Sequence, residues 1–112
     1  MIITEYSFGR ITINGQTYSK DVIIYPDHVR SPWWRKEGHL LQAEDLSGII
    51  AAKISLLIIG TGYNGVMIVP NDVLDYLHSH HIKTLVDKTG NAVEIFNKNA
   101  AASPAAAFHL TC

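Results

Sequence analysis

The chain has 112 residues, of which 47% are hydrophobic, and this size allows one domain with a single core. The formal net charge is −1, so the composition gives no general attraction to nucleic acid or an anionic membrane, and we predict neither as a partner. A single cysteine, Cys112, excludes an intramolecular disulfide and suits a reducing compartment. No signal-peptide core and no apolar run of roughly 20 residues is present. We therefore expect one soluble, cytoplasmic domain over residues 1–112.

The first predicted element is an antiparallel β-hairpin within residues 8–18. Ile11-Thr12-Ile13 and Gln16-Thr17-Tyr18 flank Asn14-Gly15, and this dipeptide between alternating segments is the strongest short-range hairpin signal. Residues 21–25 form an apolar run that predicts a third strand. Pro26 should end this strand because it lacks a backbone N–H.

The segment 27–42 has no regular pattern but is rich in aromatic and basic residues. These are His28, Arg30, Trp33, Trp34, Arg35, Lys36 and His39. A loop of this length is uncommon in a compact domain unless it is functional or mobile. In one interpretation a tryptophan fills the edge of the core while charged side chains lie over apolar surface. In another the loop binds a protein partner, because Trp and Arg are typical interface anchors. Base stacking on nucleic acid is a third, which the near-neutral charge disfavours.

Residues 43–52 have helical spacing of apolar residues after two acidic residues, and predict a helix. The run Leu56-Leu57-Ile58-Ile59 that follows lacks the alternation of a half-exposed strand. It therefore predicts a central strand of an α/β sheet, with both faces covered. Gly60 and Gly62 permit a tight turn at the carboxyl end of this strand, where ligands usually bind in such sheets.

The sequence from Gly60 to Gly65 also fits the dinucleotide pattern G-x-G-x-x-G, and Asp87 lies about 20 residues further on. A dinucleotide site needs these glycines to open a helix directly. Here residues 66–70 intervene and the helix signal begins only at Asn71. The favoured interpretation of these glycines is therefore a purely structural turn. The two alternatives are a binding site for another small ligand and a binding site for a nucleotide phosphate.

The C-terminal half alternates between helix and strand. Residues 71–81 predict a helix and residues 82–86 a strand, so the central strand and this one should be joined by a right-handed parallel crossover. A third helix should open at Thr89 or Asn91. After an alanine-rich stretch, the apolar ending from Phe108 to Cys112 predicts a last strand.

No arrangement of residues predicts a metal site, a cofactor or a catalytic group. His78 and His81 share one helix face, but zinc needs three or four ligands and the sequence places no others nearby. Cys112 and His109 are at odd spacing, so on one strand they would point to opposite faces and could not form a thiol dyad. We therefore leave the catalytic residues unknown and favour a protein that is not an enzyme.

Several short features in a fixed order run through almost the whole chain. They are Asp21 before an apolar strand, Trp34-Arg35, Leu57-Ile58-Ile59-Gly60, Gly62, Val69-Pro70, the Ile82 strand, Thr89, Ala92, Asn97, Phe108-His109 and Thr111-Cys112. In this order they resemble the Mth938-like domain family, domain-of-unknown-function family 498. The resemblance implies a compact α/β fold with a central mixed sheet, packed helices, a β-hairpin at its margin and a last strand antiparallel to its neighbours.

The resemblance carries limited functional information, because the family has no assigned reaction or cofactor. Its relatives include an adipogenesis-associated protein and a mitochondrial assembly factor of respiratory complex I. The resemblance to the mitochondrial relatives implies a protein that assists assembly rather than an enzyme. It also implies that certain residues line a shared surface or cleft: Trp34, Arg35, His39, Gly60, Thr61 and Gly62. We predict a non-enzymatic binding or assembly protein with a protein partner, as a monomer or homodimer. The alternative is a small-molecule-binding domain or enzyme with its site at the Gly60-Thr61-Gly62 loop.

Overall fold

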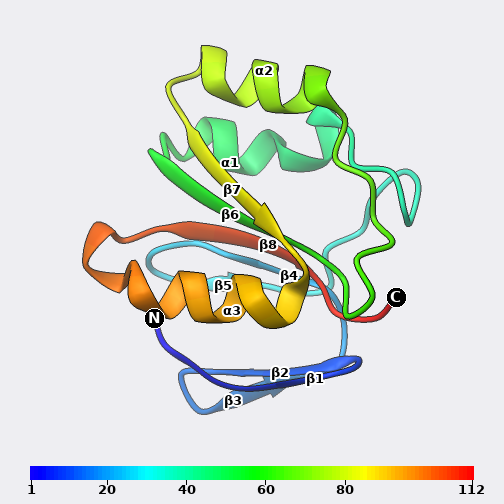
Figure 1. Cartoon of the computed structure of the whole chain (residues 1–112). Helices are drawn as coiled ribbons and strands as arrows, with labels where there is room; N and C mark the ends of the chain where they lie inside the picture. The colour runs from blue at the N-terminus through cyan, green and yellow to red at the C-terminus, as the bar shows by residue number, and fades with distance from the viewer.

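In the computed structural model, which describes residues 1–112, a five-stranded mixed β-sheet forms the middle of three layers (Figure 1). The strand order is β5-β4-β8-β6-β7. The strands are β4 (Val22–Ile24), β5 (Val29–Arg30), β6 (Leu56–Thr61), β7 (Lys83–Asp87) and β8 (Ala105–His109). Strand β6 pairs in parallel with both β7 and β8, whereas β4 pairs antiparallel with β8 and β5. The β6-α2-β7 unit is therefore the parallel strand-helix-strand unit that the sequence predicts.

Helices cover one face of this sheet, and a helix with a second sheet covers the other (Figure 1). The first group comprises the 3₁₀-helix η1 (Ala43–Leu46), α1 (Ser47–Ala51) and α2 (Asn71–Ser79). The second comprises α3 (Thr89–Lys98) and the antiparallel sheet of β1 (Ile3–Ser7), β2 (Arg10–Ile13) and β3 (Gln16–Tyr18); a 3₁₀ turn, η2 (Ala100–Ala102), follows α3. None of these helices has the length and apolar character needed to cross a bilayer.

The predicted N-terminal hairpin is confirmed, and its turn has the expected chemistry. Ile13 pairs with Gln16, so Asn14 and Gly15 form the two-residue turn. Both have positive φ, 48° and 81°, which is the conformation that a primed hairpin turn requires. The sequence did not predict β1, which adds a third strand to this hairpin.

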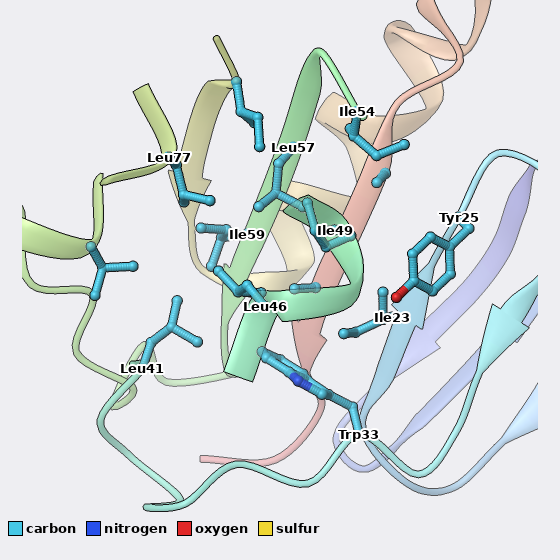
Figure 2. Close-up of a cluster of buried hydrophobic side chains, with 14 of the residues drawn as sticks. Ile23, Tyr25, Trp33, Leu41, Leu46, Ile49, Ile54, Leu57, Ile59 and Leu77 are labelled. Atoms are coloured by element: carbon cyan, nitrogen blue, oxygen red, sulfur yellow. The ribbon is translucent and has the colours of Figure 1, made fainter. Parts of the chain in front are cut away.

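Strand β6 is covered on both faces, as its unbroken apolar run predicts. Leu57, Ile58 and Ile59 are fully buried. Leu57 and Ile59 belong to the core cluster under α1 and α2, which Figure 2 shows. Ile58 lies in the opposite cluster, with Phe96 of α3. Because successive side chains of a strand point to opposite faces of the sheet, this one apolar strand contributes to two separate cores.

The middle position of the sheet belongs to β8 rather than to β6. The last strand is Ala105–His109, not the predicted 108–112, and Leu110 to Cys112 continue beyond it as a tail. The implied antiparallel arrangement is correct toward β4 but wrong toward β6, because α3 carries the chain back over β6 and returns it in the same direction. The consecutive residues Ala105, Ala106 and Ala107 are fully buried, and their small side chains leave the space that larger residues of both cores fill.

Gly60 lies at a close approach between β6, β8 and the start of α3. A Cβ at this position would lie 2.7 Å from Oγ1 of Thr89 and 2.8 Å from a ring carbon of Phe108. Both neighbours are fully buried and have no free space to move into. The glycine is therefore required here by packing.

We predict that Gly60→Ala lowers the free energy of unfolding by about 1–3 kcal/mol, because the new methyl group overpacks this contact. Gly90→Ala is the matched control, since no atom lies within 4 Å of a Cβ at that helical position. It should raise the stability slightly, by up to about 1 kcal/mol. Urea unfolding of both variants measures the difference, and equal stability of the two would contradict the packing argument.

Candidate functional site

A buried cluster of charged and polar side chains joins the start of β4, the end of β8 and the loop after β5. Because Val22 pairs with Phe108, the residues next to them, Asp21 and His109, are also neighbours. Oδ2 of Asp21 lies 2.9 Å from Nη2 of Arg35 and 2.8 Å from Nδ1 of His109. The Arg35 and His109 side chains are only 4% and 6% exposed, and that of Asp21 is 17% exposed. An ion pair this well shielded interacts more strongly than one on the surface.

The second carboxylate oxygen of Asp21 is also occupied. The backbone N–H of Leu110 donates to Oδ1 at 2.8 Å. Burial alone would raise the pKa of Asp21, but the hydrogen bonds from His109, from the Leu110 N–H and from Arg35 outweigh it, so the pKa lies below its usual value of 3.8. The carboxylate is therefore held in its charged form and fixes three segments of the chain.

The loop that delivers Arg35 is anchored by buried side chains. Nε1 of Trp33 donates to the carbonyl of Asp45 at 3.0 Å, and its ring packs in the core under η1 and α1 (Figure 2). The Arg35 guanidinium lies 4.6 Å from the centroid of that ring and donates from Nε to the carbonyl of Gly38 at 3.0 Å. Trp34 stands between these two buried residues and is 77% exposed. The loop thus presents one tryptophan to solvent from a fixed backbone.

Two hollows of about 270 Å³ each flank Trp34, which lines both. We call them the Lys20 hollow and the Arg30 hollow. The Lys20 hollow is lined by Ser19, Lys20, Asp21, Pro32, Trp33, Trp34, Arg35, Gly38 and Thr111. The Arg30 hollow is lined by Arg30, Trp33, Trp34, Lys36, Glu44, Asp45 and Ser47. Pockets that enclose small ligands measure roughly 300–1,000 Å³ and are mostly apolar, so these smaller polar hollows differ from them.

The structure brings some of the predicted site residues together and separates others. Trp34 and Arg35 lie at the hollows, and the exposed ring of His39 lies 5.4 Å from that of His109. Thr61 pairs with His109 across β6 and β8, but it is buried.

Gly60 and Gly62 line neither hollow. Gly62 has a φ of +110°, and a Cβ on it would lie 2.4 Å from the carbonyl carbon of Cys112. The C-terminal tail therefore packs directly on the glycine turn.

The sequence did not identify Asp21, His109 or Lys20 as site residues. Asp21 comes directly before a buried strand, and His109 is a polar residue inside an otherwise apolar last strand. Their positions indicate that each side chain has a hydrogen-bond partner, since polar groups at the ends of buried strands need partners. Their pairing across a separation of 88 residues depends on strand register, which the sequence does not provide.

Comparison with known families identifies this fold and its family. The family described as "Protein of unknown function (DUF498/DUF598)" matches residues 3–110. The chain belongs to this family. Among curated proteins none matches the sequence of this DUF498 domain.

Solved structures share the fold over nearly their full length. A conserved hypothetical protein from Pyrococcus horikoshii, PH1505, superposes with a TM-score of 0.85 at 22% identity and 100% coverage of both chains. The protein MT938 gives 0.81 at 26% identity, over 99% of this chain and 98% of its own. A Bordetella pertussis protein described as an Mth938-like domain gives 0.74 at 17% identity, over 97% of this chain and 85% of its own. These similarities confirm the Mth938-like fold, and they assign no reaction.

We predict that Asp21→Asn lowers the free energy of unfolding at neutral pH by about 3 kcal/mol, because it leaves the buried Arg35 charge unpaired. The folded-state pKa of Asp21 lies below the unfolded value, so its contribution is complete above about 3.8 and disappears as the pH falls through the folded-state pKa. The stability difference between parent and variant should therefore shrink on acidification.

Urea unfolding at a series of pH values measures this difference. Asp75→Asn provides the control, since that aspartate is exposed on α2 and makes no ion pair with another side chain. It should leave the pH profile of the parent unchanged. A parent-minus-variant difference that stays constant from neutral to acid pH would mean that the Asp21 charge does not stabilise the fold.

Proposed function

We propose that this DUF498 domain is a non-enzymatic binding protein whose protein partner docks on the surface around Trp34. The observation that carries the proposal is the 77% exposure of a tryptophan whose two neighbours in the sequence have buried side chains. A large aromatic side chain is normally withdrawn from water, since its burial is worth several kcal/mol at most sites. Its exposure on an anchored loop is typical of an interface residue.

Anchoring of the loop favours tight binding. Association is weakened when loops and side chains must become ordered at the interface. Here Trp33 and Arg35 already fix the backbone on both sides of Trp34. A tryptophan has only two side-chain torsions to restrict, so little further ordering is required. The residue has the properties of a binding hot spot, where aromatic anchors contribute most of the affinity.

The hollows beside Trp34 supply the complementary surface that a hot spot needs. Side chains of a partner can enter on either side of the indole, and the basic residues Lys20, Arg30 and Lys36 line the two hollows. Charges at the rim of an interface mainly guide association and select partners. A protein partner suits this surface better than a small molecule, because neither hollow is enclosed by apolar walls.

The arrangement of the buried cluster supports binding rather than catalysis. Asp21 and His109 have the spacing of an orienting carboxylate and a base. The other ring nitrogen of His109, Nε2, is buried and has no hydrogen-bond partner. A general base needs that nitrogen within reach of the proton it removes, and no nucleophile contacts it here.

We propose the cytoplasm as the place where this binding occurs. The support is the single cysteine: Cys112 is exposed and unpaired. Exposed free thiols suit a reducing compartment, where they are kept from crosslinking.

We predict that Trp34→Ala weakens capture of the partner at least about tenfold, while the free energy of unfolding changes by less than about 0.5 kcal/mol because the side chain is exposed. The measurement is affinity capture from a native extract with the tagged parent and variants, quantified by mass spectrometry, together with urea unfolding. Tyr76→Ala is the matched control, since Tyr76 is an aromatic residue 42% exposed on α2. Retention of every captured protein by a folded Trp34→Ala variant would refute the proposal.

A further inference from the structure

The Lys20 hollow is rich in hydrogen-bond donors that no group of the protein uses. The side chains of Ser19, Lys20 and Thr111 line it, and none of them donates a hydrogen bond within the molecule. Arg35 also lines the hollow, but its unpartnered Nη1 has almost no exposed surface, so the donors within reach of a ligand are those of Ser19, Lys20 and Thr111.

The one carboxylate of the hollow and the Gly38 carbonyl, by contrast, are largely occupied. Asp21 is its only carboxylate, and this side chain accepts hydrogen bonds from Leu110, His109 and Arg35. A carboxylate offers roughly four acceptor positions, so little capacity is left for a ligand that donates. The carbonyl of Gly38 accepts from both Nε and Nη2 of Arg35. These two acceptors therefore have little capacity left, whereas the hydroxyls of Ser19 and Thr111 can accept as well as donate.

The charges of the hollow also favour an anionic ligand. Lys20 and Arg35 are cationic, Asp21 is anionic, and no other Asp, Glu, Lys or Arg lines the hollow. Lys20 takes part in no salt bridge, whereas the charge of Arg35 is balanced by Asp21. One positive charge is left over, on a flexible side chain at the rim. Pro32 and Trp34 also line the hollow.

We propose that the Lys20 hollow binds the carboxylate of an acidic residue in a polypeptide segment of the partner. This proposal rests on the proposed function, because it identifies the chemistry of the partner that docks on Trp34. A volume of about 270 Å³ accommodates a single side chain. Lys20 provides the countercharge, Ser19 and Thr111 provide hydroxyl donors, and the indole of Trp34 covers the aliphatic part of the acidic side chain. The remaining exposed surface of Trp34 contacts neighbouring residues of the segment, which a free small anion cannot do.

The test is a titration of the ¹⁵N-labelled protein with the peptide acetyl-Leu-Glu-Glu-Leu-amide, followed by NMR to millimolar concentration. The peptide should shift the backbone amides of Lys20 and Thr111 and the indole N–H of Trp34. The isosteric peptide acetyl-Leu-Gln-Gln-Leu-amide should not shift them. Lys20→Gln should weaken binding about fivefold or more, because it removes the unpaired charge. Lys98→Gln, at the exposed end of α3, removes the same charge elsewhere and should bind as the parent does.

Several outcomes overturn the proposal. The first is the absence of shifts at these three residues, and the second is equal binding of the glutamate and glutamine peptides. Acetate or inorganic phosphate that binds as tightly as the acidic peptide would assign the hollow to free small anions instead. If Trp34→Ala loses the captured partner but the acidic peptide does not bind, only this inference fails. If the peptide binds but Trp34→Ala keeps every partner, the proposed function fails and the carboxylate site stands.

Discussion

The carboxylate of Asp21 is the interaction on which the rest of this surface depends. It accepts hydrogen bonds from the loop through Arg35, from β8 through His109 and from the C-terminal tail through the Leu110 N–H. Asp21 itself lies directly before β4, the strand that follows the small sheet, and its backbone carbonyl accepts from the N–H of Trp33 at 2.8 Å. Because these partners are buried, loss of the carboxylate would leave a positive charge without compensation in a poorly solvated place. The position of the loop is thus determined by electrostatics as well as by packing.

A second set of hydrogen bonds explains why the glycine-rich turn after β6 differs from a phosphate-binding loop. In nucleotide-binding folds, the backbone N–H groups of this turn point toward the ligand. Here the Gly62 N–H donates to Oγ1 of Thr89 at 2.8 Å, and that hydroxyl donates to the carbonyl of His109 at 2.6 Å. The tail also accepts hydrogen bonds from residues after the turn, including one from the N–H of Tyr63 to the carbonyl of Thr111 at 2.7 Å. The protein's own backbone thus occupies the place where a phosphate would lie. The candidate binding surface, which comprises Trp34 and the Lys20 hollow, lies instead beside β4 and β8.

The parts of the fold that could be predicted from the sequence are those with a local physical signature. The unbroken apolar run of β6 and the Asn14-Gly15 turn both act over a few residues, and both predictions are confirmed. The middle position of β8 could not be predicted, because three alanines have neither strand propensity nor periodicity. Loop composition indicated Trp34 and Arg35, but it could not show which tryptophan is buried. The Asp21–His109 contact joins residues far apart in the chain, and only the β4–β8 register creates it.

The opposite environments of Trp33 and Trp34 connect the stability of this loop to the exposure of Trp34. Trp33 and Arg35 point inward and Trp34 outward, so the side chains of three consecutive residues alternate as they would along an extended chain. Hydrogen bonds from the indole of Trp33 to Asp45 and from Arg35 to Asp21 hold that alternation in place. A change that weakens either bond would loosen the backbone that carries Trp34. Under the proposed function, the buried contacts favour binding without touching the partner, since they keep Trp34 exposed and its backbone ordered before association.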